Sequence, residues 1–255
     1  MYELYFHKSP NTYKPAIMLE ELTIEYQTRL VQVGRGEQFS PSFVEISPNS
    51  KVPVLIDNEP EGGGEPIVLF ESCAILLYLA DKHRRLIPSS PRGRADVLKW
   101  LFWHAASQSP MNGQCAHFRM FSPETTYAVE RYSREVRRLM AVLENRLLQS
   151  PFVGGAEYSI ADIACYPWLD KARLALGLES LDEFPSVAIW CKGISERPAI
   201  QRAVDRFERD EQGGTNLQEF AKNMFGHNAE QAERAARNAR ETINRMGLHL
   251  ADDKN

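Results

Sequence analysis

Two short segments of the chain combine residue types that suit the binding of a small charged molecule. Val52-Pro53 stands at the start of an apolar run, and Glu71-Ser72 lies between a second apolar run and a helical pattern. Proline is tolerated at the first residue of a strand, and an X-Pro bond adopts the cis form at small cost. We predict that Val52-Pro53 is cis, which would turn the Val52 backbone outward to pair with an extended peptide. Glu71, Ser72 and the free N–H groups that open their helix would face a ligand bearing both an ammonium and a carboxylate.

A third segment, Ser9-Pro10-Asn11, follows the first predicted strand and opens the first predicted helix. The unpaired N–H groups and the positive end of that helix would point at the same pocket. Ser9 and Asn11 add a hydroxyl and an amide, both of which can donate hydrogen bonds. The pattern therefore predicts a pocket that stabilises negative charge.

This arrangement resembles the glutathione site of the cytosolic glutathione transferases, and the likeness runs from Met1 to about Phe207. Three segments look most like the Nu class, the bacterial and fungal branch associated with glutathione-dependent disulfide-bond reduction: Tyr5-Phe6-His7-Lys8-Ser9-Pro10-Asn11, Gly36-Glu37-Gln38-Phe39 and Ile46-Ser47-Pro48-Asn49. The resemblance implies an α/β plus all-α fold, in which a thioredoxin-like N-terminal domain precedes an all-helical C-terminal domain. It also implies glutathione as co-substrate.

The implied chemistry needs a thiolate. Glutathione is mostly protonated at neutral pH if its thiol pKa resembles the ~8.5 of a free cysteine. We expect the Ser9 hydroxyl and the Asn11 amide or backbone N–H to hydrogen-bond the sulfur; the alternative is that both residues only cap the helix. Tyr5 would be the donor in transferases of animal type, but the strand alternation favours a packing role. Similar Nu-class members carry threonine at Ser9, so the hydroxyl is kept and the methyl that fixes its rotamer is lost.

The other charges of the tripeptide need partners as well. The γ-glutamyl ammonium and carboxylate suit Glu71 and Ser72. The Nu pattern also implies an arginine, Arg131, that could clamp a carboxylate of a second glutathione through its planar fork. The alternative for Arg131 is a surface ion pair with Glu130 or Glu135. The predicted binding set is Gln38, Asn49 and Lys51 for the glycyl carboxylate, Val52 and Pro53 for the peptide backbone, Glu71, Ser72 and Arg131.

Strand and helix patterns alternate in the first part of the chain, which we assign as residues 1–84. Tyr2, Leu4 and Phe6 alternate with polar neighbours, as in a strand. The further predicted elements are a helix through Ala16–Leu22, strands at Gln27–Val33, Val52–Asp57 and Ile67–Phe70, the last two joined by Gly62-Gly63-Gly64, and a helix at Cys73–Lys82.

From Arg92 onward the periodic segments are helical, and residues 91–207 form the predicted second domain. Ser159 and Asp162 have the spacing of a capping box before an apolar helix, so we interpret Asp162 as structural. Residues 208–255 form a predicted C-terminal helical extension, reached through a charged, solvated linker from Arg206 to Glu211. Its two helices, near Leu217–Phe225 and Ala229–Met246, would pack on their own domain or on a partner subunit.

Charge and composition restrict the class of protein. The chain has 30 Lys and Arg against 34 Asp and Glu, a net charge of -4, which gives no basic field for nucleic acid. No run approaches the roughly 18 apolar residues of a membrane span, and no signal peptide is recognisable, so we expect a cytoplasmic protein. The four cysteines lack CxxC or metal-ligand spacing, which predicts free, buried thiols and no metal.

Three functions fit the implied site. The first is a glutathione-dependent disulfide-bond oxidoreductase, in which the bound glutathione thiolate attacks a small disulfide. The second is a transferase or peroxidase acting on electrophiles or hydroperoxides, and the third is a non-catalytic glutathione-binding regulator. The resemblance also implies a homodimer, with Phe39, Phe43 and the helices near Trp100 and Arg131 as the suggested contact region.

Overall fold

A computed structural model describes residues 1–178 and 180–210. Its elements, in chain order, are β1 (Tyr2–Phe6), α1 (Pro10–Leu22), β2 (Tyr26–Leu30), the 3-10 turns Val33–Arg35 and Glu37–Phe39, α2 (Pro41–Ile46), β3 (Val54–Asp57), β4 (Ile67–Phe70), α3 (Ser72–His83), α4 (Pro91–Trp103), a π-helical turn at His104–Gln108, α5 (Ser109–Phe121), α6 (Thr126–Gln149), α7 (Ile160–Cys165), the 3-10 turn Tyr166–Trp168, α8 (Leu169–Leu176), α9 (Pro185–Ser195) and α10 (Pro198–Asp210).

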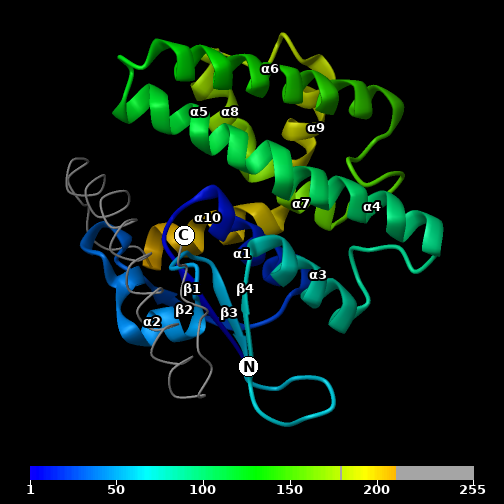
Figure 1. Ribbon diagram of the computed structural model, residues 1–255. Helices are drawn as coiled ribbons and strands as arrows, with labels where there is room; N and C mark the ends of the chain where they lie inside the picture. The colour runs from blue at the N-terminus through cyan, green and yellow to red at the C-terminus, as the bar shows by residue number, and fades with distance from the viewer. Residues whose placement is uncertain (179, 211–255) are drawn as a thin grey trace, which may run out of the picture. The chain divides into compact units, whose positions relative to one another are not determined.

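The strands form a sheet in the order β2-β1-β3-β4, with β1 parallel to β2 and antiparallel to β3 (Figure 1). Tyr2, Leu4 and Phe6 are buried on one face of β1, as the alternation predicts. The turn between β3 and β4 uses positive φ angles at Gly62, Gly63 and Gly64, which explains the three consecutive glycines. This is the thioredoxin-like arrangement that the sequence predicts.

Two strands are shorter than predicted. β2 spans Tyr26–Leu30 instead of Gln27–Val33, and β3 begins at Val54 instead of Val52. Val52-Pro53 precedes the ladder because proline has no N–H to donate to it. The Val52-Pro53 bond is cis, as predicted.

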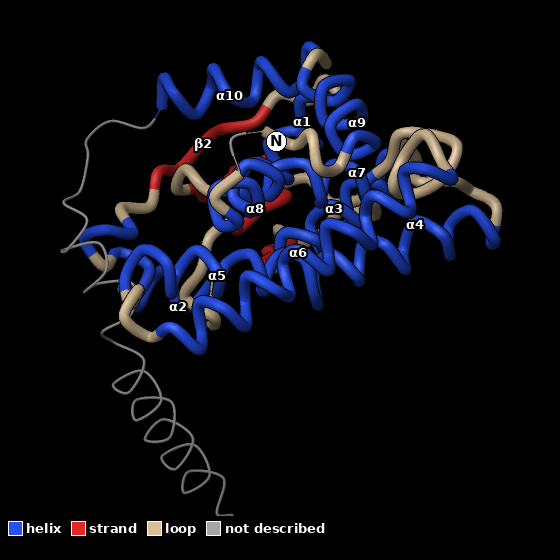
Figure 2. Tube along the Cα trace, turned by 90° about the horizontal axis from the view of Figure 1, so that it is seen from above, coloured by secondary structure: helices blue, strands red, loops and turns tan. Residues whose placement is uncertain are grey.

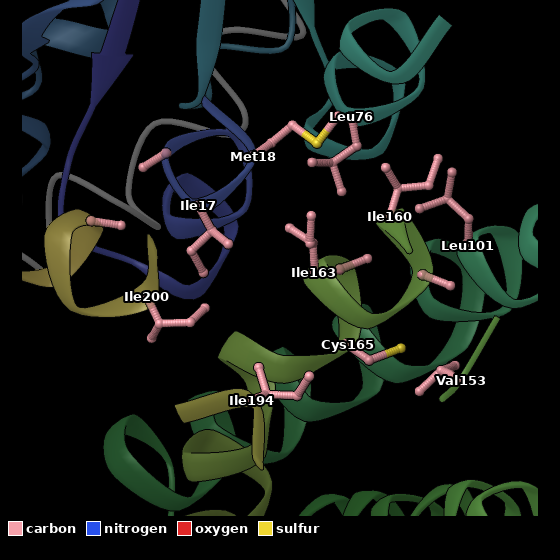
Figure 3. Packing of buried hydrophobic residues seen from close by; sticks show 14 of the residues in the cluster. Ile17, Met18, Leu76, Leu101, Val153, Ile160, Ile163, Cys165, Ile194 and Ile200 are labelled. Carbon is pink, nitrogen blue, oxygen red and sulfur yellow. The ribbon is translucent and has the colours of Figure 1, made fainter. Parts of the chain in front are cut away.

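The remaining helices pack on α1 and α3. Both of these helices contact the sheet on one side and α7 on the other, while α5 and α6 lie side by side as a hairpin (Figures 1 and 2). Figure 3 shows the shared core, in which Ile17 and Met18 of α1 and Leu76 of α3 face Ile160 and Ile163 of α7. All five side chains are at most 2% exposed. The sheet and the helical part are therefore joined by one continuous apolar core.

The capping box of α7 is confirmed. Asp162 is buried and accepts hydrogen bonds from the N–H of Ser159 at 3.0 Å and of Val153 at 2.8 Å. The indole of Trp190 donates a third bond at 2.9 Å. Burial raises the pKa of Asp162 above its usual range, although these bonds act in the opposite direction. Its role is structural, as the spacing predicts.

The prediction of a solvated linker from Arg206 is wrong for residues 206–210, which continue α10. Arg206 lies over the ring of Tyr26 at 4.2 Å, and Asp210 accepts a 2.7 Å hydrogen bond from Thr28. These partners lie far away in the sequence, on β2, beside which α10 runs (Figure 2). The helix therefore also crosses the predicted domain boundary at residue 207.

By its contacts the chain divides into two compact units, residues 1–31 with 38–212 and residues 32–37 with 213–255. The predicted helices near Leu217–Phe225 and Ala229–Met246 lie outside the described residues. Within the described part of the chain, no helix has the length and apolarity that crossing a membrane requires.

Candidate functional site

Ser9 forms the N-terminal cap of α1. It has extended backbone angles, its hydroxyl accepts from the N–H of Thr12 at 3.4 Å, and the Thr12 hydroxyl accepts from the N–H of Ser9 at 3.1 Å. The capping alternative for Ser9 is therefore observed. Capping uses a lone pair of the hydroxyl, whose proton can be donated either to the Thr12 hydroxyl, 3.2 Å away, or to a ligand. Ser9 is half-buried.

Asn11 has a side chain whose orientation is fixed by its neighbours. Its Oδ1 accepts from Nζ of Lys14 at 2.8 Å, from Nε1 of Trp168 at 3.0 Å and from the hydroxyl of Ser109 at 3.4 Å. An indole N–H and an ammonium can only donate, so the atom that they face must be the oxygen. The amide nitrogen consequently points the other way, and none of the described residues accepts from it. Its two N–H groups are available to a ligand at the N-terminus of α1.

Lys14 joins this end of α1 to the start of α3. Its side chain is buried at 1% exposure, and Nζ also donates to the hydroxyl of Ser72 at 3.1 Å. Burial lowers the pKa of Lys14 to about 8, an effect that nearby Cys73, Cys165 and Glu71 partly offset. The buried ammonium of Lys14 therefore contacts both Asn11, which is predicted to bind the sulfur, and Ser72, which is predicted to bind the γ-glutamyl group.

Glu71 has backbone angles of φ 71° and ψ 108°, which are unfavourable for a residue with a side chain. It precedes α3, its side chain makes no capping bond, and it is exposed. Residues held in such conformations cluster at functional sites. The strained backbone projects a free carboxylate beside Ser72 and the N–H groups that open α3.

The residues predicted to hold the glycyl carboxylate differ in exposure. Asn49 and Lys51 are exposed, and the Ser47 hydroxyl bonds both the N–H and the carbonyl of Lys51, at 3.3 and 2.9 Å, which fixes that loop. Gln38 is only 2% exposed. Asn49 and Lys51 are therefore open to solvent in this structure, whereas Gln38 is covered.

Arg131 is exposed on α6. Glu130 pairs with Arg134 at 2.8 Å and Glu135 with Arg138 at 2.7 Å, and the charge of Arg131 also helps to lower the pKa of Glu135. Among the described residues, no carboxylate pairs with Arg131.

Tyr5 and Phe43 pack on each other. The ring of Tyr5 lies 6.3 Å from that of Phe43, which agrees with the packing role predicted for Tyr5. Phe43 itself is 5% exposed. The Phe43 side chain itself therefore offers little surface to a partner subunit.

All four cysteines are free, as predicted. Cys115 and Cys165 are buried, while Cys73 and Cys191 are partly exposed. Burial raises the pKa of the Cys73 thiol, although Lys14 and Ser72 act in the opposite direction, and it raises that of Cys165 more strongly. No group of side chains within residues 1–178 and 180–210 could hold a metal ion.

Lys14, Trp168 and Ser109 are site residues that sequence reasoning missed. Lys14 gives one signal, since it is a lysine on a helix face that is otherwise apolar. Trp168 and Ser109 give none, because their contact with Asn11 depends on tertiary packing.

Comparison with known proteins identifies the family. The glutathione S-transferase N-terminal domain matches residues 2–81, and the glutathione S-transferase C-terminal domain matches residues 126–193. The chain is 45% identical over 208 residues to the disulfide-bond oxidoreductase YfcG of Escherichia coli, which covers 80% of this chain and 94% of YfcG. The chain belongs to the glutathione transferase family.

Solved structures of family members agree with this assignment. A glutathione transferase family member from Pseudomonas fluorescens with two glutathione molecules bound is 34% identical, with a TM-score of 0.75, covering 80% of this chain and 92% of that one. A glutathione transferase from Pseudomonas putida with one glutathione disulfide bound per subunit is 35% identical, with a TM-score of 0.75 and coverage of 80% and 90%. The predicted resemblance and the predicted fold are confirmed.

Proposed function

We propose that this protein is a glutathione-dependent disulfide-bond oxidoreductase in which bound glutathione, and not a protein cysteine, carries the exchange. The observation behind the proposal is the orientation of Asn11, whose oxygen is occupied by Lys14 and Trp168. Its amide N–H groups therefore point away from these partners, where a ligand can reach them, and amide donors stabilise a thiolate over a thiol. The name of YfcG, disulfide-bond oxidoreductase, supports the reaction class.

In the proposed pose the glutathione sulfur lies between Ser9 and Asn11, and the γ-glutamyl group lies at Glu71 and Ser72. The backbone of Val52, before the cis bond to Pro53, pairs with the tripeptide. Gln38, Asn49 and Lys51 take the glycyl carboxylate, which requires Gln38 to become accessible.

The reaction then proceeds in two exchanges. The glutathione thiolate attacks one sulfur of a small disulfide RSSR, the S–S bond breaks, and RS⁻ leaves and takes a proton from solvent. A second glutathione thiolate attacks the glutathione sulfur of the mixed disulfide and releases the second RS⁻, so that two glutathione molecules are oxidised to one glutathione disulfide. Arg131, which is exposed and forms no direct ion pair among the described residues, would hold a carboxylate of the second glutathione. The neighbour with two bound glutathione molecules supports this stoichiometry.

The protein thiols suit this assignment. Cys73 follows Ser72 directly, but its raised pKa keeps it protonated at neutral pH, and thiols attack disulfides as thiolates. Four free cysteines and no disulfide also fit a reducing, cytoplasmic location.

We further propose a homodimer. Large apolar side chains are exposed on β4 and α4: Ile67 at 36%, Val68 at 43%, Phe70 at 40% and Phe102 at 63%. Such surfaces commonly mark protein contacts. Light scattering at micromolar concentration should give twice the 29.1 kDa mass of the chain, and a monomer would contradict this proposal alone.

The decisive experiment compares two reactions of the purified protein. We expect glutathione-dependent reduction of 2-hydroxyethyl disulfide, and a much slower conjugation of chlorodinitrobenzene. Asn11→Ala should lower disulfide reduction on the order of tenfold or more, the equivalent of about 1.4 kcal/mol. Faster conjugation than reduction would favour the transferase alternative, and glutathione binding without either reaction would favour the regulator.

A further inference from the structure

Lys14 is a buried lysine that pairs with no carboxylate. Its side chain is 1% exposed, and none of the ion pairs among the described residues includes it. A buried charge without a counter-ion destabilises a fold, so lysines are almost never fully buried unless paired. Within the described part of the chain, its two hydrogen bonds go to uncharged oxygens, Oδ1 of Asn11 and Oγ of Ser72. Burial of the Lys14 charge lowers the stability of the fold and is not offset by an ion pair, which points to a role of Lys14 in function.

The titratable groups around Lys14 come from three further elements. Cys73 lies on α3, Cys165 ends α7, and His104 begins the π-helical turn between α4 and α5. Burial raises the pKa of both thiols, so they are uncharged at neutral pH. His104 is also uncharged, because burial and the charge of Lys14 hold its pKa well below the usual range. Glu71 is the carboxylate that acts on Lys14, and it is exposed to solvent. The positive charge is therefore left largely unneutralised until an anion arrives.

We propose that Lys14 is a positioning residue that couples the two halves of the glutathione site. Its ammonium holds Asn11 with the amide N–H groups on the sulfur, and holds Ser72 with its hydroxyl proton on the γ-glutamyl carboxylate. Its charge favours the thiolate over the thiol. This inference rests on the proposed glutathione function and assigns to one residue the link between sulfur activation and recognition of the γ-glutamyl end.

The hydrogen-bond inventory leads to this coupling. Ser72 Oγ accepts from Lys14, so its single proton is left for another acceptor, which is the Cys73 side chain in the free protein and would be the ligand carboxylate in the complex. Asn11 Oδ1 accepts from a cation, which polarises the amide and strengthens donation from its nitrogen. In a buried site of low effective dielectric constant, the charge itself also acts on an anion nearby. Loss of the Lys14 charge should therefore weaken three effects together: the orientation of the Ser72 hydroxyl, hydrogen-bond donation by the Asn11 amide, and the electrostatic stabilisation of the thiolate.

The coupling has a reciprocal consequence. An anionic ligand that gains from the charge of Lys14 must equally favour the protonated form of Lys14. Glutathione binding should therefore raise the pKa of Lys14 from its value of about 8 in the free protein. Above that value, proton uptake by Lys14 would accompany binding.

The first test measures ionisation of the bound thiol by its ultraviolet thiolate absorbance across pH. Lys14→Met replaces the lysine by an apolar side chain of similar length. In this variant the thiol of bound glutathione should titrate about one pH unit higher than in the wild type. At pH 6.5 the rate of disulfide reduction should fall about tenfold through kcat. Lys14→Gln, which can still donate to Asn11 but lacks the charge, should give an intermediate shift.

Lys82→Met is the matched control. Unlike the fully buried Lys14, Lys82 is a partly buried lysine of the N-terminal domain. It is paired with the buried carboxylate of Asp57 and contacts none of the site residues. This variant should lose stability and leave the thiol titration unchanged. A similar shift in Lys82→Met would show that loss of a buried cation acts through general destabilisation, and would overturn the inference.

A second measurement requires no variant. Lysines labelled with ¹³C at Cε are titrated by NMR in the wild type, with and without S-methylglutathione, whose blocked thiol cannot ionise. The resonance that titrates near pH 8 belongs to Lys14, and its midpoint should rise by at least half a unit when the ligand is bound. An unchanged midpoint would overturn the inference.

The outcomes separate this inference from the proposed function. If calorimetry shows that the wild type does not bind glutathione, the proposed function fails and the role of Lys14 fails with it. If Lys14→Met binds glutathione and its bound thiol titrates as in the wild type, the role of Lys14 alone is wrong.

Discussion

Nε1 of Trp168 donates a 3.0 Å hydrogen bond to Oδ1 of Asn11 across 157 residues of sequence. The indole belongs to the helical part of the chain, and the amide stands at the first turn of α1, beside the sheet. The helical domain therefore takes part in orienting a donor that the N-terminal domain presents.

Trp168→Phe tests this contact, because it removes the indole N–H and keeps an aromatic ring. We expect disulfide reduction to fall about two- to fivefold, as for the loss of one neutral hydrogen bond worth about 1 kcal/mol. Trp190→Phe is the control, since its indole bonds Asp162 in the α7 cap and does not contact Asn11. It should lower stability and leave turnover per folded molecule unchanged; equal loss of turnover in both variants would argue against an orienting role for Trp168.

Ser9 should show two separable effects, since it caps α1 and is proposed to donate to the sulfur. Ser9→Ala is expected to lower the free energy of unfolding by about 1 kcal/mol, as for other lost N-caps, and to reduce turnover on the order of tenfold. Ser90 caps α4, with its hydroxyl accepting from Gly93 at 3.2 Å, and offers a matched variant. Ser90→Ala should lose similar stability in urea denaturation with normal turnover. Normal turnover in Ser9→Ala would reduce Ser9 to a cap.

Glu71 should show stability and affinity changes of opposite sign. Glu71→Gly relieves the unfavourable φ of 71° and should raise the free energy of unfolding by about 1 kcal/mol. The same change removes the carboxylate that is proposed to face the γ-glutamyl ammonium. The binding free energy of glutathione should therefore weaken by about 1–3 kcal/mol, which raises the dissociation constant roughly 5- to 150-fold. Calorimetry and denaturation on one preparation measure both. Unaltered affinity in Glu71→Gly would place the ligand elsewhere.

Local patterns account for the parts of the fold that the sequence predicts well. The alternation of Tyr2, Leu4 and Phe6, the three glycines before β4 and the capping box of Ser159 each depend on residues a few positions apart. Their preferred conformations are those that the structure shows, because tertiary packing agrees with them.

Distant partners account for what the sequence could not predict. Residues 206–210 have the composition of a solvated linker, yet Arg206 and Asp210 meet Tyr26 and Thr28 on β2 and the helix continues. The position of Lys14 on a helix face gives a weak signal, but its burial and its contact with Ser72 become visible only when α3 and α7 pack on α1. The motifs located the pocket, but the contacts that orient Asn11 come from elements that no local pattern connects.

The pKa of Lys14 predicts how stability changes with pH. It falls from the 10.5 of an unperturbed lysine to about 8 in the fold, mainly because burial disfavours the charged form. Below pH 8 both folded and unfolded states bind this proton, and the fold carries the full cost of burying the charge. Between about pH 8 and 10.5 the folded state releases the proton and the unfolded state keeps it, so stability rises with pH.

The free energy of unfolding of the wild type, minus that of Lys14→Met, should therefore increase by about 2–3 kcal/mol from pH 7 to pH 10. Urea denaturation at several pH values measures it. For Lys82→Met the corresponding difference should stay flat in this range: burial lowers the pKa of Lys82, but hydrogen bonds to Asp57 and Tyr2 outweigh it and raise the pKa above 10.5. A flat profile for Lys14→Met as well would mean that Lys14 titrates normally.

The last prediction concerns which thiol reacts. If glutathione carries the exchange, a protein with all four cysteines replaced by alanine should keep disulfide reduction within about twofold per folded molecule. Cys115 and Cys165 are completely buried, so their replacement should cost stability, which circular dichroism and denaturation would register. Cys73 is the thiol adjacent to Ser72, and Cys73→Ala alone tests it with less risk to folding. Asn11→Ala supplies the opposite case, a folded protein that keeps every cysteine and should lose activity. Should Cys73→Ala abolish reduction while Asn11→Ala remains active, a protein thiolate would be the nucleophile, and Asn11 would be no more than part of the helix start.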